Sequence, residues 1–397
     1  MAWKETYVMD ERMKFVAEWL SEELSFAELC RQHGVSRKTG YKFIGRYKSE
    51  GPSGLEDRSR APHHHPNEVD AYREAAILAL RKKRPTWGAK KLKDRLEKDH
   101  WHLQWPALST IAEILDRHGV VRRRKLRRRG ASHLSPLSSA EAANQVWGID
   151  FKGWFRTGDG ERCDPFTVSD LASRYILRLQ VVDRPDGEHV WPILDATFRE
   201  VGLPEVIRSD NGPPFASTAP AGLSWLAVRL IKAGVKPEYI KPGRPDQNGR
   251  HERMHLTLKQ ETANPPAANK RAQQRRFNEF RQIFNQERPH EALELATPAE
   301  HYQPSPRSYS GRLREPEYPA DHQVRRVHNN GDIKWLGGRV FLSEALIGEP
   351  VGIVETDQGL HIIHYGPIFL GHLDRAGAFH KGQPRQPKQP EPPTQNV

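Results

Sequence analysis

The central part of the chain, residues 144–290, alternates short apolar runs with amphipathic helical patterns, and this alternation restricts it to a sheet covered by helices. Three successive strands with short turns are predicted first, and helices that alternate with two short strands follow. The predicted strands are 146–155, 166–169, 176–182, 205–208 and 238–240. The predicted helices are 189–201, 221–234, 246–261 and 270–287. An antiparallel meander followed by this alternation indicates an α/β domain with a mixed five-stranded sheet.

Three carboxylates stand at distinctive positions on this predicted scaffold. Asp150 lies inside an apolar strand, Asp210 begins an Asp-Asn-Gly turn after another strand, and Glu252 lies in the first turns of a helix. Each also has an ordinary interpretation, as a strand-edge acid, a turn residue or a solvated helix acid paired with arginine. Oxygen ligands from separate elements favour a hard cation over zinc. We therefore expect Asp150, Asp210 and Glu252 to be catalytic and to hold two Mg²⁺ or Mn²⁺ ions.

Two further side chains share the helix face of Glu252. His255 and Lys259 follow it at i+3 and i+7. We expect Lys259 to reach a DNA phosphate close to the metal site. His255 is expected either to line the site in a supporting role or to be structural.

The charge of the chain predicts a polyanionic partner. Lysine and arginine total 62 against 50 acids, the formal net charge is +12, and the pI is about 9.6. Nucleic acid is therefore the expected ligand, and metal-dependent phosphoryl transfer on it the expected chemistry. A concentrated basic block is predicted to contact DNA phosphates, although a nuclear signal or disorder would fit the same composition. The block spans residues 122–129, and the residues expected to contact DNA are Arg122, Arg123, Arg124, Lys125, Arg127 and Arg128.

The N-terminal residues 1–50 are predicted to form a helix-turn-helix domain. Ser25 has the pattern of an N-cap with a capping box to Glu28, Gly34 ends that helix, and Ser36 starts the next one. The second helix would offer Arg37, Lys38, Thr39 and Lys42 to a DNA groove. An ordinary helical hairpin is the alternative.

The rest of the chain divides by composition. A linker (51–66) precedes a second helical DNA-binding module (67–121), and a basic linker (122–143) leads to the catalytic core (144–305). Short strand patterns and Gly-containing turns predict a small β-barrel at 322–375, and the Pro/Gln-rich tail 376–397 is expected to be disordered. The two cysteines, Cys30 and Cys163, lack metal-ligand spacing. We expect a cytoplasmic protein without a membrane span or signal peptide.

Taken together, the motifs resemble one family. They are Asp150, Asp210-Asn211-Gly212, the run Pro245–Arg253 around Asn248 and Glu252, the run Phe284–Leu293 with Thr297-Pro298, and the linker Gly54–Pro62. Over roughly residues 10–305 they resemble DDE insertion-sequence transposases of the retroviral integrase superfamily. The resemblance implies an RNase H-like core, Mg²⁺ dependence, double-stranded transposon-end and target DNA as partners, and a homo-oligomer in bacterial cytoplasm. It also implies supporting roles for Asn211 and Asn248.

Some alternatives stay open at this point. The spacing between Asp210 and Glu252 is slightly longer than is usual in retroviral-type integrases, so Asp246 and Glu261 are rivals for the third carboxylate. A DNA-binding regulator with an inactive core, and an RNase H-type nuclease that hydrolyses without joining, are the competing functions. The intact set of acids speaks against the first, and the helix-turn-helix speaks against the second.

Overall fold

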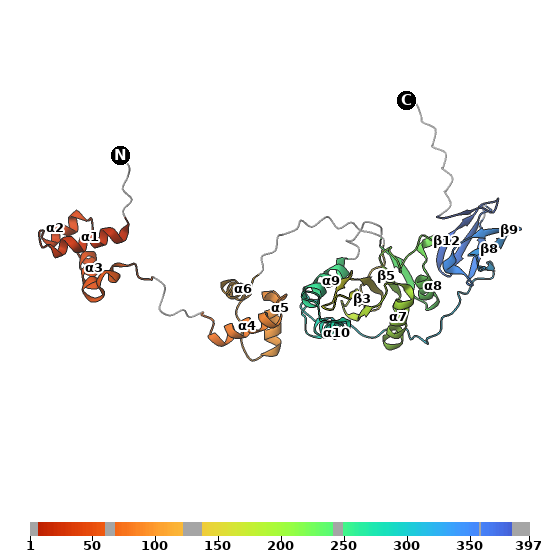
Figure 1. Cartoon of the computed structure of the whole chain (residues 1–397), viewed down its shortest axis with the longest axis horizontal. Helices are drawn as coiled ribbons and strands as arrows, with labels where there is room; N and C mark the ends of the chain where they lie inside the picture. The colour runs from red at the N-terminus through yellow and green to blue at the C-terminus, as the bar shows by residue number, and fades with distance from the viewer. Residues whose placement is uncertain (1–6, 60–67, 122–136, 241–248, 357–358, 383–397) are drawn as a thin grey trace, which may run out of the picture. The chain divides into compact units, whose positions relative to one another are not determined.

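A computed structural model describes residues 7–59, 68–121, 137–240, 249–356 and 359–382, which are coloured in Figure 1. The chain divides into two compact units, Met1–Val69 and Asp70–Val397. Within the described residues, no helix is long and apolar enough to cross a membrane. Several predicted features lie outside the described residues. These are the basic block 122–129, Asp246, Asn248 and the tail from 383 onward.

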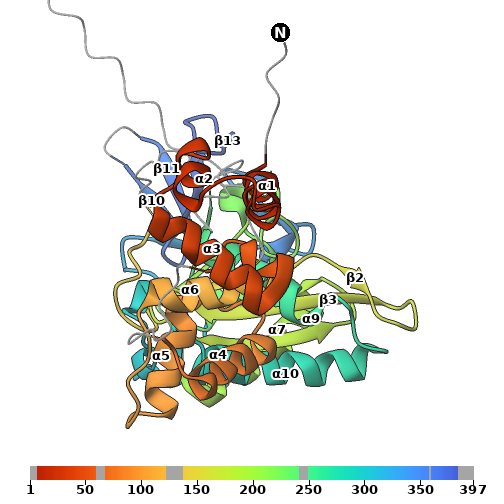
Figure 2. The same cartoon turned by 90° about the vertical axis from the view of Figure 1, so that its left-hand side faces the viewer.

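The N-terminal unit is a three-helix bundle made by α1 (Val8–Leu20), α2 (Phe26–Gln32) and α3 (Arg37–Glu50) (Figure 2). The hydroxyls of Ser25 and Ser36 accept the expected N-cap hydrogen bonds. The capping box is only half formed, because the carboxylate of Glu28 binds Arg31 instead. A Cβ on Gly40 would lie 2.9 Å from the Cys30 sulfur, so glycine permits the close approach of α3 to α2. The predicted helix-turn-helix is present.

A second bundle of three helices opens the larger unit. It consists of α4 (Ala71–Lys83), α5 (Ala89–Asp99) and α6 (Leu108–Arg117). Asp70 caps α4 through its side chain, and apolar residues at helical spacing fill the interior. The buried apolar set is Ile77, Trp87, Leu92, Leu96, Trp105, Ile111, Ile114 and Leu115.

The sheet of the core is mixed, as the sequence predicts. Its strands are β1 (Val146–Phe151), β2 (Phe155–Arg156), β3 (Arg162–Asp170), β4 (Ile176–Val182), β5 (Val206–Ser209) and β6 (Lys236–Tyr239). Five of them follow the order β4-β3-β1-β5-β6, with β1 antiparallel to β3 and parallel to β5. The two-residue β2 pairs with the start of β3 as a sixth strand, which the predicted single run 146–155 did not separate from β1.

Helices cover both faces of this sheet, and Figure 1 shows the strands between them. The helices α7 (Gly187–Val201) and α8 (Trp225–Lys232) pack on one face around Trp147, Phe166 and Phe198. The helices α9 (Gly249–Thr262) and α10 (Lys270–Gln286) pack on the other face around Leu258, Phe277 and Phe280. The sheet is therefore buried on two sides.

The C-terminal part is not the predicted β-barrel. Its main sheet is open, with five strands in the order β13-β12-β11-β10-β7, and β8 and β9 form a separate hairpin. An open sheet suffices because its apolar face is covered by the core, through Leu223 at the end of the 3-10 helix η2 (Pro220–Gly222) and through Ala227 and Val228 of α8. The strand β13 extends the order beyond the predicted end at 375. The bounds are β7 Gln323–Arg326, β8 Asp332–Trp335, β9 Gly338–Phe341, β10 Pro350–Glu355, β11 His361–Tyr365, β12 Ile368–Leu373 and β13 Phe379–His380.

Candidate active site

Two of the predicted carboxylates stand at matching ends of neighbouring parallel strands. Gly148 of β1 pairs with Arg208 of β5, so continuing the same register two residues onward brings Asp150 opposite Asp210. Neighbouring strands lie about 4.8 Å apart, which is close enough for two carboxylates to share an ion. The Asp210 carboxylate accepts a hydrogen bond from the Gly212 amide at 3.1 Å, so the turn orients it. The parallel pairing of β1 with β5 therefore assembles this part of the site.

The third predicted carboxylate is close enough to change the ionisation of the first. Burial raises the pKa of Asp150 to about 7, and the charge of Asp210 and, more weakly, that of Glu252 add to the shift. Glu252 itself is exposed in the first turn of α9. The mutual effect of the three carboxylates on the pKa of Asp150 indicates a cluster of negative charge, which a divalent cation would relieve.

Two histidines of α9 lie beneath this cluster. Thr167 of β3 binds the Nε2 atoms of His251 and His255 at 2.6 and 2.8 Å, and its hydroxyl also lies 3.0 Å from the Asp150 carbonyl oxygen. The His255 Nδ1 atom is 3.8 Å from an Asp150 carboxylate oxygen. Burial lowers the pKa of His251 to about 3 and that of His255 well below its ordinary value, so the contact with Asp150 is not an ion pair at neutral pH. His255 is a buried neighbour of Asp150, consistent with its predicted supporting position.

A second set of possible metal ligands, Asp150 with His251 and His255, also lies within 4.8 Å. The hydrogen bonds of His251 argue against it. Its Nε2 faces Thr167, and its Nδ1 is 3.1 Å from the Ser169 hydroxyl, so both ring nitrogens are already engaged. The three carboxylates offer only oxygen and fit a hard divalent cation better.

The His251 ring also explains a glycine in the sequence motif. A Cβ on Gly148 would meet the His251 Nδ1 atom at 2.9 Å and Leu171 at the same distance. Glycine at this position therefore lets α9 approach β1, and that approach brings Glu252 to the acids.

A lysine beside the site was not singled out from the sequence. The pKa of Lys152 is lowered by burial and by the charge of Lys259, and the charge of Asp150 opposes this shift. Lys152, Lys259 and Asp150 are therefore neighbours, and the two lysines can meet a phosphate beside the acids. Strand alternation was the available signal, because residue 152, directly after β1, continues the alternation that places it on the face of residue 150.

The other predicted residues are distributed as follows. Arg37, Lys38 and Lys42 are exposed on α3 in the other unit, whereas the Thr39 hydroxyl contacts the Ser36 hydroxyl at 2.9 Å within the cap. Asn211 is exposed, and its amide donates to the Ile240 carbonyl, which links the turn after β5 to the end of β6.

The raised pKa of Asp150 predicts that removing its charge stabilises the fold more at high pH than at low pH. Because the folded pKa is about 7 and the ordinary value is 3.8, stability is lost as the pH rises between these values. We consider the change in the free energy of unfolding that Asp150→Asn causes in the absence of divalent metal. This change is expected to be more favourable at pH 8 than at pH 4 by on the order of 3 kcal/mol. Thermal unfolding of both proteins across this range measures the difference. An equal effect at both pH values would contradict a raised pKa.

Solved structures with detectable similarity include retroviral integrases. A simian T-cell lymphotropic virus intasome in complex with a PP2A regulatory subunit is 15% identical, with a TM-score of 0.36, and the match covers 72% of this chain and 91% of that chain. The HTLV-2 integrase catalytic core domain in complex with magnesium is 14% identical, with a TM-score of 0.30, over 41% of this chain and 97% of that chain.

Two relatives come from insertion elements. The "Insertion element IS407 uncharacterized 31.7 kDa protein" of Burkholderia multivorans is 29% identical over 238 residues, which are 59% of this chain and 81% of that protein. The "Insertion element IS476 uncharacterized 39.2 kDa protein" of Xanthomonas euvesicatoria is 30% identical over 183 residues, which are 45% of this chain and 50% of that protein.

Protein families match both the core and the N-terminal bundles. Residues 140–245 and 233–298 match families described as Integrase core domain. Residues 11–63 match a Helix-turn-helix domain, and residues 39–115 match a Homeodomain-like domain. The chain thus matches helix-turn-helix domains followed by an integrase core domain, and its resemblance to insertion-sequence transposases is confirmed.

Proposed function

We propose that the protein is a DDE transposase, which binds the DNA ends of its element, cleaves them and joins them to target DNA. The observation that carries the proposal is the pairing of β1 with β5, since it supports a shared position for Asp150 and Asp210 with Glu252 nearby. The integrase core and the helix-turn-helix domains support DNA as the substrate. Assembly of several copies on the DNA is part of the proposal, because each joining event involves two ends.

The residues of the site divide into three roles under this proposal. Asp150, Asp210 and Glu252 would hold the metal, Mg²⁺ or Mn²⁺, as two ions. When bound, such a pair supplies an activated oxygen nucleophile and stabilises the leaving oxygen. Lys152 and Lys259 would bind the scissile phosphate and offset its charge. Thr167 and His255 would hold the β1 end and the Asp150 side chain in position.

One assay separates this proposal from its two competitors. The full chain is incubated with a duplex carrying the element's end, with a target plasmid and with Mg²⁺. Joined products support the transposase, binding without any strand cleavage supports an inactive regulator, and cleaved but unjoined strands support a nuclease. Omission of Mg²⁺ by chelation is expected to stop both cleavage and joining while leaving binding intact.

Reading of the DNA ends is expected to depend on the N-terminal unit. It forms its own core and presents Arg37, Lys38 and Lys42 on the exposed face of α3. A chain lacking residues 1–69 is expected to bind end and random duplexes with equal affinity, because phosphate contacts elsewhere carry no sequence information. Competition binding at fixed salt measures the preference. A preference that survives the deletion would assign end recognition to the bundle of α4, α5 and α6.

A further inference from the structure

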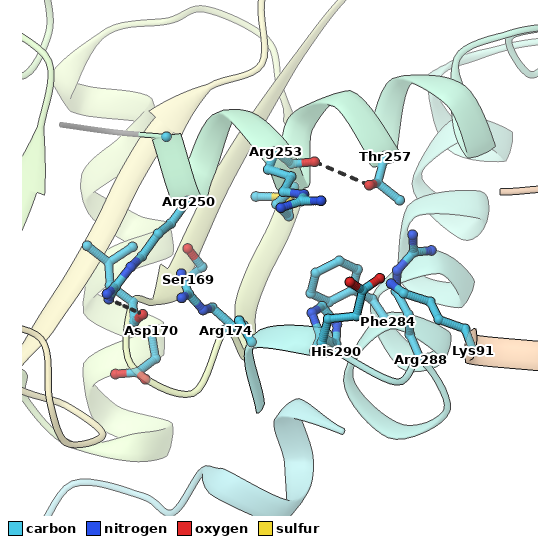
Figure 3. A pocket seen from close by; sticks show the side chains of 15 residues that line it. Lys91, Ser169, Asp170, Arg174, Arg250, Arg253, Thr257, Phe284, Arg288 and His290 are labelled. Atoms are coloured by element: carbon cyan, nitrogen blue, oxygen red, sulfur yellow. Dashed lines mark hydrogen bonds between the residues drawn. The ribbon is translucent and has the colours of Figure 1, made fainter. Parts of the chain in front are cut away.

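A cavity lies on the side of α9 that faces away from the acids. Its volume is about 260 Å³, and its walls come from four segments: α5, the end of β3 with the turn that follows, α9, and the end of α10 with the residues after it (Figure 3). Along α9, Arg250, Arg253 and Thr257 line the cavity, whereas Glu252 and Lys259 are absent from its lining. At 100° per residue these two groups occupy opposite sides of the helix. The cavity, named here the α9 rear pocket, is therefore separate from the acid cluster.

Cations dominate the lining of this pocket. Five are present: Lys91, Arg174, Arg250, Arg253 and Arg288. Arg288 pairs with Glu261 at 2.8 Å, and Arg250 donates to the Leu171 carbonyl at 2.9 Å. Lys91, Arg174 and Arg253 have no ion-pair partner among the residues that the structure describes. Three positive groups thus face one small cavity without a direct ion pair to any described residue.

The two acids of the lining, Asp170 and Glu291, offset only part of the positive charge of these five cations. The buried carboxylate of Asp170 is already occupied, since it accepts hydrogen bonds from the Asn144 amide at 2.7 Å and from the amide and hydroxyl of Ser173 at 2.7 and 2.6 Å. Glu291 is exposed. The net charge that a ligand meets in the pocket is therefore positive.

The pKa values of two lining groups reflect the same excess of positive charge. Burial and then the charge of Arg288 lower the pKa of Lys91 to about 8, and burial and then Arg250 lower the pKa of Arg174 to about 10. His290 also lines the pocket, and its buried Nε2 atom has no hydrogen-bond partner among the described residues. An anion with several acceptor oxygens would relieve the repulsion between the cations and use their free donors.

We propose that the α9 rear pocket binds a phosphate group carried by a nucleotide or by a DNA strand, at a place distinct from the acid cluster. Three cations around one cavity, each without an ion-pair partner in the described ranges, match the charge and the acceptor count of a phosphate. The apolar side chains of Leu171, Met254 and Phe284 in the same walls leave room for an attached sugar or base to make apolar contacts. The site does not depend on which carboxylates hold the metal.

The first arm of the test uses small phosphates. Binding of inorganic phosphate and of dAMP to the full chain is measured by calorimetry for the wild type and for Arg253→Gln and Arg174→Gln. Arg275→Gln is the matched control, because Arg275 is exposed on α10 and lies outside the pocket. Each pocket variant is expected to weaken binding at least about tenfold, since a charge-assisted hydrogen bond is lost, while the control binds as the wild type does. Arg253 is exposed and makes no side-chain hydrogen bond within the described residues, so its variant is expected to fold.

The second arm uses DNA and applies if the small phosphates do not bind. The affinity for a random duplex is measured against salt concentration without divalent metal. Loss of one phosphate contact is expected to lower the log-log slope by about 0.9 in each pocket variant and not in Arg275→Gln. Weaker binding of phosphate or dAMP by the pocket variants assigns the site to free phosphates. A lower salt slope in these variants, without binding of the small phosphates, assigns it to the DNA backbone. If the pocket variants match the control in both arms, the proposal is overturned.

Discussion

Replacing Asp150 or Asp210 by asparagine is expected to lower strand cleavage and joining by at least about 10³-fold, or roughly 4 kcal/mol in transition-state free energy. An amide keeps the size of the side chain but removes the negative charge that holds a divalent ion. The register of β1 with β5 leads the two residues to matching strand ends, so the loss of either would remove one of the three proposed carboxylate ligands. The measurement is the single-turnover rate with a pre-cleaved DNA end and Mg²⁺.

DNA affinity provides the control for this result. Binding rests on arginine and lysine contacts with phosphates, so each variant is expected to bind end DNA within about threefold of the wild type. Because Asp150→Asn is also expected to be more stable at pH 8 without metal, misfolding would not explain its inactivity. Strand transfer at the wild-type rate by either variant in Mg²⁺ would remove that residue from the site.

Glu252→Gln is the second variant with a large expected effect. It should lower the joining rate by about 10²- to 10³-fold, because Glu252 is the acid of α9 whose charge reaches Asp150. Glu261→Gln is the matched control on the same helix. The Glu261 carboxylate lies 2.8 Å from Arg288 and also accepts from Thr86, so it is engaged in structural contacts. It also lies about 13 Å further along the helix axis.

The two glutamate variants are expected to lose different properties, Glu252→Gln the joining rate and Glu261→Gln the thermal stability. Glu261→Gln should keep the joining rate within about threefold while it lowers thermal stability, since it leaves the largely buried Arg288 without its partner. A normal joining rate in Glu252→Gln would show that another acid supplies the third ligand. Asp246, which lies outside the described residues, would then be the next residue to change.

The local parts of the fold were predictable because their signals are local. Ser25 and Ser36 mark helix starts through their own backbone hydrogen bonds, and the strand around Asp150 is recognisable from its apolar neighbours. The turn Asp210-Asn211-Gly212 requires no distant partner. The grouping of the acids was predictable only through the family resemblance, because the parallel pairing of β1 with β5 joins segments that are some 60 residues apart.

Features that depend on packing between distant segments could not be predicted from the sequence. The small β-barrel was expected because alternating strands suggest closure, whereas the observed sheet stays open with its apolar face covered by η2 and α8. His251 was not recognised, since its role comes from Thr167 and Ser169 on another element. The α9 rear pocket combines residues from four segments, and although Arg250, Arg253 and Arg288 lie within the two quoted motif runs, nothing in the sequence indicates that these runs meet around one cavity.

The double packing of α8 has a consequence for how the molecule can be divided. Leu226 and Leu230 belong to the core of the integrase sheet, while Ala227 and Val228 belong to the core of the C-terminal sheet. The pair Lys232–Glu349, 2.7 Å apart and largely buried, crosses the same boundary. Proteolysis that removes the C-terminal strands would therefore expose an apolar stripe on α8, the helix that packs against the core sheet. A minimal fragment designed to end near residue 305 would need polar replacements on that stripe to avoid aggregation.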